Sequence, residues 1–267
     1  MRLRGNVPAL LCLVVTFCAY PAAAQTTTLK PETTRAFDEY VRQAETRMRQ
    51  RVDGRVSFLW LDEHPTERAK AMAGELVIEN LTANGGKAPG GLIHDWLGAM
   101  FIPGASIQDV VRFFQDPAHQ KEFYPEVLES RELGRDGNSI RIYRRFLKKK
   151  VLTAVLDAEF ESRYEYPDDS RCAVSEHSTK IVEVQNHGEP DERTLPAGGD
   201  RGFMWRLNSY WRLEKVEGGV LAELRTISLS RGIPTGLGWM IKPFITGIPV
   251  ESLTSTLEGT RKALGKR

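Results

Sequence analysis

The sequence predicts an α+β fold in which a curved antiparallel sheet of about seven strands wraps around a long C-terminal helix. Three observations carry this prediction: six strand-like segments follow one another, turn residues separate them, and an amphipathic stretch at 249–264 closes the chain. Strands joined by tight turns pair antiparallel. One sheet bent around the last helix is the economical way to cover that helix's apolar side.

The six segments share period-two alternation and are bounded by turn signals such as Asp136-Gly137 and Glu217-Gly218. We expect strands at 127–134, 138–148, 151–165, 171–185, 203–216 and 219–231.

Before them, 92–102 reads as a strand ended by Pro103-Gly104, and Ser106 caps the first of two short helices. Residues 31–51 have the apolar spacing of an N-terminal helix, and apolar runs at 58–61 and 76–81 are read as added strands.

The first 24 residues have the pattern of a secretory signal peptide. Arg2 and Arg4 precede about 14 mostly apolar residues, and Ala22-Ala23-Ala24 suits a signal peptidase. We therefore expect a periplasmic or secreted protein that begins at Gln25, with an uncleaved anchor as the alternative. Of the three cysteines only Cys172 then remains, and we expect a buried, inert thiol.

Charge counts argue against bulk nucleic-acid binding. The chain has 37 Lys+Arg and 35 Asp+Glu, and losing Arg2 and Arg4 leaves 35 of each. Nucleic-acid binding by charge needs a strong positive field. Six cations do lie within 141–150, but acids in the next strand, Asp157 and Glu159 among them, explain much of that cluster by cross-strand pairing.

Charge also selects a register for the last hairpin. With Glu217-Gly218 as a two-residue loop, Arg212 faces Glu223 and Tyr210 faces Arg225, whereas the alternative loop places like charges opposite each other. The preferred register gives the other face of the hairpin large Trp211 beside small residues. That pattern fits either an interdigitated core or a hollow.

No catalytic motif is present: there is no GxSxG, P-loop, GxGxxG after a strand, or HExxH. The five histidines are scattered, and His94 and Asp95, as strand neighbours, point to opposite faces. We predict no cofactor, no metal and no catalytic residue.

The segment 236–248 is apolar and holds three glycines and Pro243. Glycine and proline argue against one continuous helix here. Two interpretations stay open: the segment packs under the sheet, or it makes a transient contact with a membrane.

This order of elements resembles the START-like (SRPBCC, helix-grip) superfamily, and the stretches 91–104, 203–212 and 229–234 resemble its secreted bacterial members. The resemblance covers about 91–264 and implies a deep cavity between sheet and last helix, used for apolar ligands. We divide the chain into a signal peptide (1–24), an N-terminal helix and strand extension (25–90) and a START-like ligand-binding domain (91–267).

We hypothesise that the chain binds, and transports, a hydrophobic small molecule or lipid. An enzyme of the cyclase/aromatase or hydrolase kind is the alternative, with His177, Arg206, Tyr210 or Glu223 as its acid or base, and a module that binds another envelope protein is a third. The expected cavity lining is drawn from alternation, with two residues at the mouth: Leu156, Phe160, Trp205, Leu207, Ser209, Trp211, Leu224 and Thr226, then Met240 and Phe244.

Overall fold

The computed structural model describes residues 27–82, 86–149, 153–232 and 238–265, without the side chains of 149, 238–246 and 248. The signal-peptide prediction lies outside these residues. Among the described helices, none combines the length and apolar character that crossing a membrane requires.

The chain folds around one antiparallel sheet of ten strands in the order β1-β3-β10-β9-β7-β6-β5-β4, with β2 on β3 and β8 on β7. The strands are β1 (Val77–Asn80), β2 (Lys87–Ala88), β3 (Gly91–Pro103), β4 (Val127–Asp136), β5 (Ser139–Lys149), β6 (Thr153–Asp168), β7 (Arg171–Gln185), β8 (Arg193–Thr194), β9 (Arg206–Val216) and β10 (Gly219–Arg231). The seven long strands are those predicted, and the excess comes from the short β1, β2 and β8.

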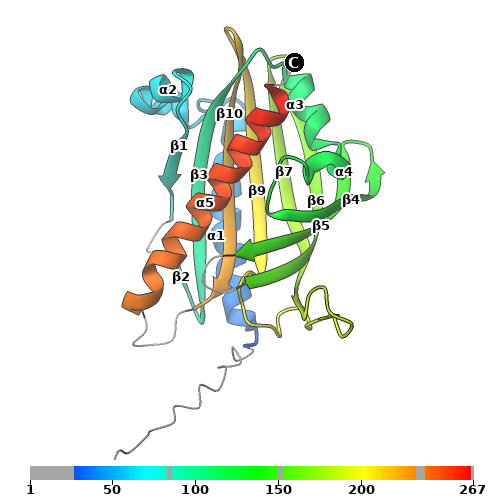
Figure 1. The fold of residues 1–267 in the computed structure, drawn as a ribbon. Coiled ribbons are helices and arrows are strands. Elements are labelled where there is room, and N and C mark those ends of the chain that lie inside the picture. Colours follow the sequence, from blue (N-terminus) through cyan, green and yellow to red (C-terminus); the bar gives the residue numbers. More distant parts are fainter. Residues whose placement is uncertain (1–26, 83–85, 150–152, 233–237, 266–267) are drawn as a thin grey trace, which may run out of the picture.

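Helices cover both faces of the sheet. They are α1 (Pro31–Val52), η1 (Leu61–Glu63), α2 (Pro65–Met72), α3 (Ile107–Phe114), α4 (Pro117–Gln120) and α5 (Gly238–Leu264). We call the face toward α5 the inner face and the face toward α1 the outer face (Figure 1). The two short helices after β3 and the long C-terminal helix confirm the predicted α+β arrangement.

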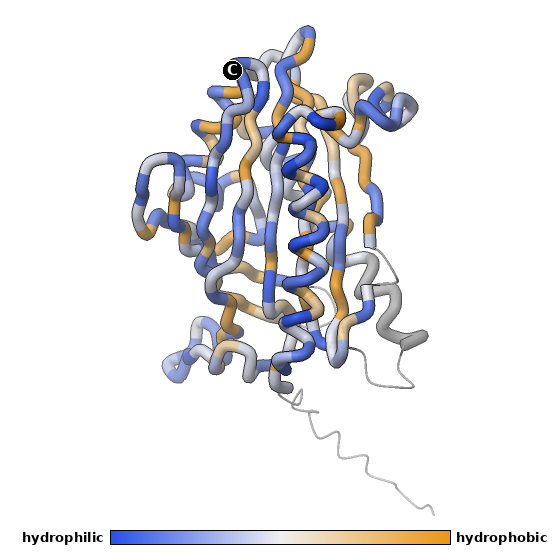
Figure 2. The backbone as a smooth tube through the Cα atoms, turned by 180° about the vertical axis from the view of Figure 1, so that it is seen from behind, coloured by the Kyte–Doolittle hydropathy of each residue, from blue (hydrophilic) through white to orange (hydrophobic). Residues whose placement is uncertain are grey.

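The N-terminal segment packs on the outer face. α1 starts at Pro31, whose missing N–H costs nothing at a helix start. One stripe of α1, including Phe37 and Val41, is buried against the sheet, while Figure 2 shows its hydrophilic side turned outward. Leu59 and Leu61 pack against β3 and β10. Residues 27–82 therefore share the core of the sheet.

The strands expected between 56 and 82 are only partly present. β1 covers Val77–Asn80, but the run at 58–61 leads into η1 and α2. Pro65 explains the difference, because proline fits the first turn of a helix and has no N–H for a strand ladder.

The β9–β10 pairing has the register that the charges predicted. Glu223 lies opposite Arg212 and Arg225 opposite Tyr210, while Leu224 faces Trp211 on the inner side. The two charged rows point to the outer face.

Two buried ion pairs follow from this register. The Arg212 Nε and Glu223 Oε2 atoms are 3.5 Å apart, and Glu223 also accepts hydrogen bonds from the backbone N–H groups of Trp60 (3.0 Å) and Leu61 (2.8 Å). Arg225 donates two hydrogen bonds to the fully buried Asp95.

α5 differs from the prediction. A helix was expected from about 249, with 236–248 unable to continue it, but one helix spans Gly238–Leu264 and includes Pro243 and Pro249. Each proline removes one N–H donor from the helix and kinks it. The residues on either side of the proline can still be helical. The side chains that a membrane contact would use lie outside the described residues, so that contact stays a prediction.

α5 rests directly on β3 at Gly98. A Cβ atom added there would lie 2.6 Å from Leu257 Cδ1 and 2.9 Å from Leu253 Cγ. Both leucines are buried in the main core cluster, so neither has free space to move into.

Gly98→Ala should therefore lower the free energy of unfolding by about 1–3 kcal/mol, the usual cost of overpacking. Urea denaturation measures the effect. Gly199→Ala is the control, because its added Cβ meets only ordinary contacts at 3.6 Å. Equal stability of the two variants would contradict the close approach of α5.

Glu223→Gln should destabilise the fold by about 3–5 kcal/mol, because it leaves the Arg212 charge buried without its partner. Glu39→Gln removes an exposed pair with Arg42 and should cost under about 1 kcal/mol. Similar unfolding midpoints for both would mean that Arg212 is solvated in the folded protein.

Candidate functional site

The inner face divides into two halves. In the filled half, α3 and the last turns of α5 pack on the sheet to form a continuous core. The rings of Phe114 and Trp211 lie 4.7 Å apart between their centroids. Cys172 is fully buried here, as predicted for an inert thiol, and burial raises the pKa of its thiol to about 12.

The open half lies toward the start of β3 and the end of β10. Its inward side chains stay partly exposed although they stand on central strands: Trp96, Ser178, Leu207, Ser209, Thr226 and Ser228. Inward side chains of a central strand are normally buried when other side chains cover them. α5 crosses the inner face obliquely, with its end beside α3 and its start out past β3 on the side of β1 and β2 (Figure 1). The candidate site is the part of the inner face beside α5 that carries these residues.

One ion pair lies on the inner face beside this region. Arg144 Nη1 donates to Glu176 Oε1 at 2.7 Å, and Arg144 Nε donates to Gln120 Oε1 at 3.0 Å. Ser162 Oγ donates to the other Glu176 oxygen at 2.7 Å, and the guanidinium lies 5.2 Å from the centre of the Phe160 ring. The side chains of Arg144 and Glu176 are 13% and 14% exposed, so the pair is nearly but not fully covered.

Two tyrosines flank the pair. The Tyr124 hydroxyl lies 2.9 Å from Thr260 Oγ1 of α5, and Tyr164 is buried on β6. Burial raises the pKa of both hydroxyls. Both therefore stay neutral at physiological pH.

A histidine occupies the other side of the open half. His94 Nε2 lies 3.0 Å from Ser230 Oγ. Burial lowers the pKa of His94 to about 4. Its strand neighbour Asp95 points to the outer face and bonds Arg225, which confirms that His94 and Asp95 face opposite ways.

The expected lining residues fall into five groups. Leu156 and Phe160 are buried in a small inner cluster that Leu207 joins. Ser209 and Thr226 are cross-strand partners in the open half. The others are elsewhere: Trp211 and Leu224 belong to the filled half, Trp205 lies in the outer cluster under α1, and the side chains of Met240 and Phe244 are outside the described residues.

Trp205 departs from the predicted face for a local reason. The strand was expected from 203, but β9 begins at Arg206, so alternation does not extend back to Trp205. The Trp205 Nε1 donates instead to the buried Asp200 at 3.0 Å.

Sequence reasoning missed Arg144, Glu176 and His94. It treated Arg144 as part of a solvated basic cluster paired with the next strand. Pairing with an acid of the next strand does explain Arg145, whose Nε donates to Asp157 at 2.6 Å. Arg144 points inward with Ile140 and Ile142, and period-two alternation over 140–146 was the signal available.

The residues named for an enzyme lie away from this site. His177 Nε2 is 2.6 Å from Glu45 Oε1, and the Tyr210 hydroxyl donates to the same oxygen at 2.8 Å, all beneath α1. Glu223 is held by Arg212 on the outer face. Within the described ranges, no three His, Cys, Asp or Glu side chains gather in a way that could hold a metal ion.

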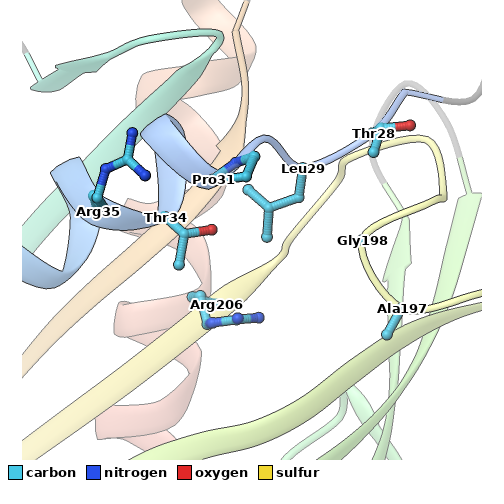
Figure 3. A pocket seen from close by; sticks show the side chains of 8 residues that line it. All are labelled: Thr28, Leu29, Pro31, Thr34, Arg35, Ala197, Gly198 and Arg206. Carbon is cyan, nitrogen blue, oxygen red and sulfur yellow. The ribbon is translucent and has the colours of Figure 1, made fainter.

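Two depressions are formed by described residues of the outer face. One, of about 500 Å³, lies between the start of α1, the 197–198 loop and Arg206 (Figure 3). The other, of about 420 Å³, lies at the ends of β5–β7 near Val155 and Arg201. Both are wide open to solvent and lie on the side opposite the candidate site.

No family model and no curated protein matches this sequence. Solved structures with similar folds include a STAR-related lipid transfer protein from Xanthomonas axonopodis (19% identity, 67% of this chain and 96% of that one, TM-score 0.45) and human STARD10 (10%, 75% and 79%, 0.44). The Zhui aromatase/cyclase from a Streptomyces species is also similar (7%, 66% and 94%, 0.43).

At these identities no residue role transfers to this chain. The fold is assigned from the topology of this chain. It consists of β3, two short helices, a run of antiparallel strands, and a closing helix against the inner face. The chain therefore has the helix-grip arrangement that its sequence predicts, an antiparallel sheet against a long closing helix.

Proposed function

We propose that this protein binds a hydrophobic small molecule on the open half of the inner face, beside α5. The supporting observation is the partial exposure of inward side chains on central strands, notably Leu207, Ser209 and Thr226. Small side chains at Ser209 and Thr226 leave room above the sheet, whereas Trp211 and Leu224 fill the neighbouring rows.

The energy for binding comes from apolar burial. A ligand that loses roughly 300 Å² of apolar surface gains about 7 kcal/mol at about 25 cal/mol per Å². Lost translational freedom and ordering subtract from this. Because a Kd of 1 μM corresponds to about 8 kcal/mol, a ligand of this size should bind more weakly than micromolar, and tighter binding needs a larger buried apolar surface.

The Arg144–Glu176 pair is the polar end of the proposed site. A buried ion pair contributes little net stability, since desolvation offsets its attraction. Arg144 keeps N–H donors beyond those that bond Glu176 and Gln120. Because Glu176 already balances the charge, a ligand hydroxyl or carbonyl suits these donors better than a carboxylate does.

A carrier outside the cytoplasm is the role that this binding would serve, given the predicted signal peptide. The enzyme alternative would use the same space, with Arg144, Glu176 and His94 as its polar groups. Unchanged recovery of a bound molecule after long incubation favours the carrier, and conversion of it favours the enzyme.

Filling the open half should weaken binding. Ser209→Trp should lower the affinity for a fluorescent long-chain alcohol by more than about tenfold, because the indole takes the ligand's space. Thr179→Trp, at an exposed position of β7, should leave affinity unchanged. If wild-type protein, delipidated and titrated, shows no saturable binding of this probe or of a fluorescent fatty acid, the proposed function is wrong.

Replacing the inner ion pair should lower the affinity for a neutral probe, whereas replacing an outer ion pair should not. Arg144→Met with Glu176→Met removes both charges together and should reduce affinity about five- to tenfold, the worth of one hydrogen bond. Arg145→Met with Asp157→Met removes the neighbouring pair on the outer face and is the control. Equal affinities in both double variants would show that Arg144 does not bind the ligand.

A further inference from the structure

His94 offers a second polar group at the far side of the open half. Besides Ser230, its surroundings include Ser228, which is its direct partner on β10. No described residue bonds its Nδ1 atom. The imidazole is therefore fixed at Nε2 and has one nitrogen left for another molecule.

The histidine is uncharged under ordinary conditions. Its pKa is lowered to about 4 by burial, so above about pH 5 it acts as a neutral donor or acceptor. The carboxylates of its own strand and of β10, Asp95 and Glu223, face outward and are bonded there. No described carboxylate bonds His94, and a charged ligand group gains no ion pair from it.

The registers place His94 and Arg144 at two ends of one band across the inner face. On one side, Ile142, Phe160 and Ser178 lie in a row across β5, β6 and β7. The Leu207 N–H donates to Ser178 Oγ at 3.0 Å, and the row continues through Ser228 to His94. Arg144 is the next inward residue after Ile142 on β5.

Five strand-to-strand steps separate β5 from β3, which is about 24 Å along the sheet at about 4.8 Å per step and less across its concave side. Phe160 is fully buried beneath the Arg144 guanidinium, and the partly exposed side chains between that group and His94 are Ser178, Leu207 and Ser228. The band thus has a polar group at each end, with Leu207 as its exposed apolar side chain and with Ser178 Oγ already bonded to the Leu207 N–H.

We propose that the ligand is an elongated, uncharged molecule with a hydrogen-bonding group at each end, one bound by Arg144 and the other by His94. This inference rests on the proposed function. It excludes simple fatty acids and simple alcohols as the best ligands, because each leaves one end of the band without a partner.

Straight-chain alcohols and their terminal diols of equal length test this by displacement of the fluorescent probe. Short diols should bind no better than short alcohols, because they cannot span the band. Above a threshold length, the diol should bind about five- to tenfold more tightly than the matching alcohol, because it makes one additional hydrogen bond. This comparison needs no variant and so does not depend on mutant folding.

Variants of His94 test whether this residue binds the second end of the ligand. His94→Leu should abolish the diol's advantage, His94→Gln should restore part of it, and His177→Leu on the outer face should not change it. The advantage should be constant from pH 6 to 8, since His94 does not titrate there. Saturable binding with equal affinities for alcohol and diol at every length would overturn the inference while the proposed function stands. Absence of binding by every probe would overturn both.

Discussion

The pairing of β9 with β10 is the constraint on which the rest of the structure depends. Side chains alternate between the two faces, so a slip of one residue would turn every inward side chain of the slipped strand outward. If β9 slipped, Arg212 would point to the inner face, away from Glu223, and Trp211 would point to the outer face. The observed register keeps the charges on the outer face, where the N–H groups of Trp60 and Leu61 complete the bonding of Glu223.

This arrangement gives the N-terminal segment a physical role. The outer face carries charged side chains in its central rows, and these are costly to bury without partners. α1 brings partners with it: Tyr40 bonds Asp95, and Glu45 bonds both His177 and Tyr210. α1 therefore covers the charged middle of the outer face and satisfies its polar groups there.

Much of the fold was predictable from the sequence because it is set by local periodicity. The long strands of 127–231 alternate cleanly, and charge selected the β9–β10 register correctly. The failures occurred where a local rule met tertiary packing. Proline in α5 reads as a helix breaker, yet a helix already seated on Gly98 continues through it.

The candidate site was harder to predict for a related reason. Apolar alternation identifies which face is inward, and it placed Leu207, Ser209 and Thr226 correctly on that face. It cannot tell a filled row from an open one, because that depends on where α3 and α5 end. Arg144 was missed because six cations in ten residues look like a solvated surface, and only strand parity separates Arg144 from Arg145.

The division of the inner face follows from the lengths of the elements that cover it. α3 is eight residues long and reaches only the rows of Trp211 and Leu213, where large side chains meet Phe114. Beyond those rows several inward side chains are serine or threonine, standing beside Trp96 and Leu207, and polar groups appear at Glu176 and His94. Serine and threonine would pack poorly against a helix that needed them as core. Serine and threonine at these positions, with Arg144 and His94 on either side keeping hydrogen-bonding atoms that no described residue bonds, are the features on which the proposed binding rests.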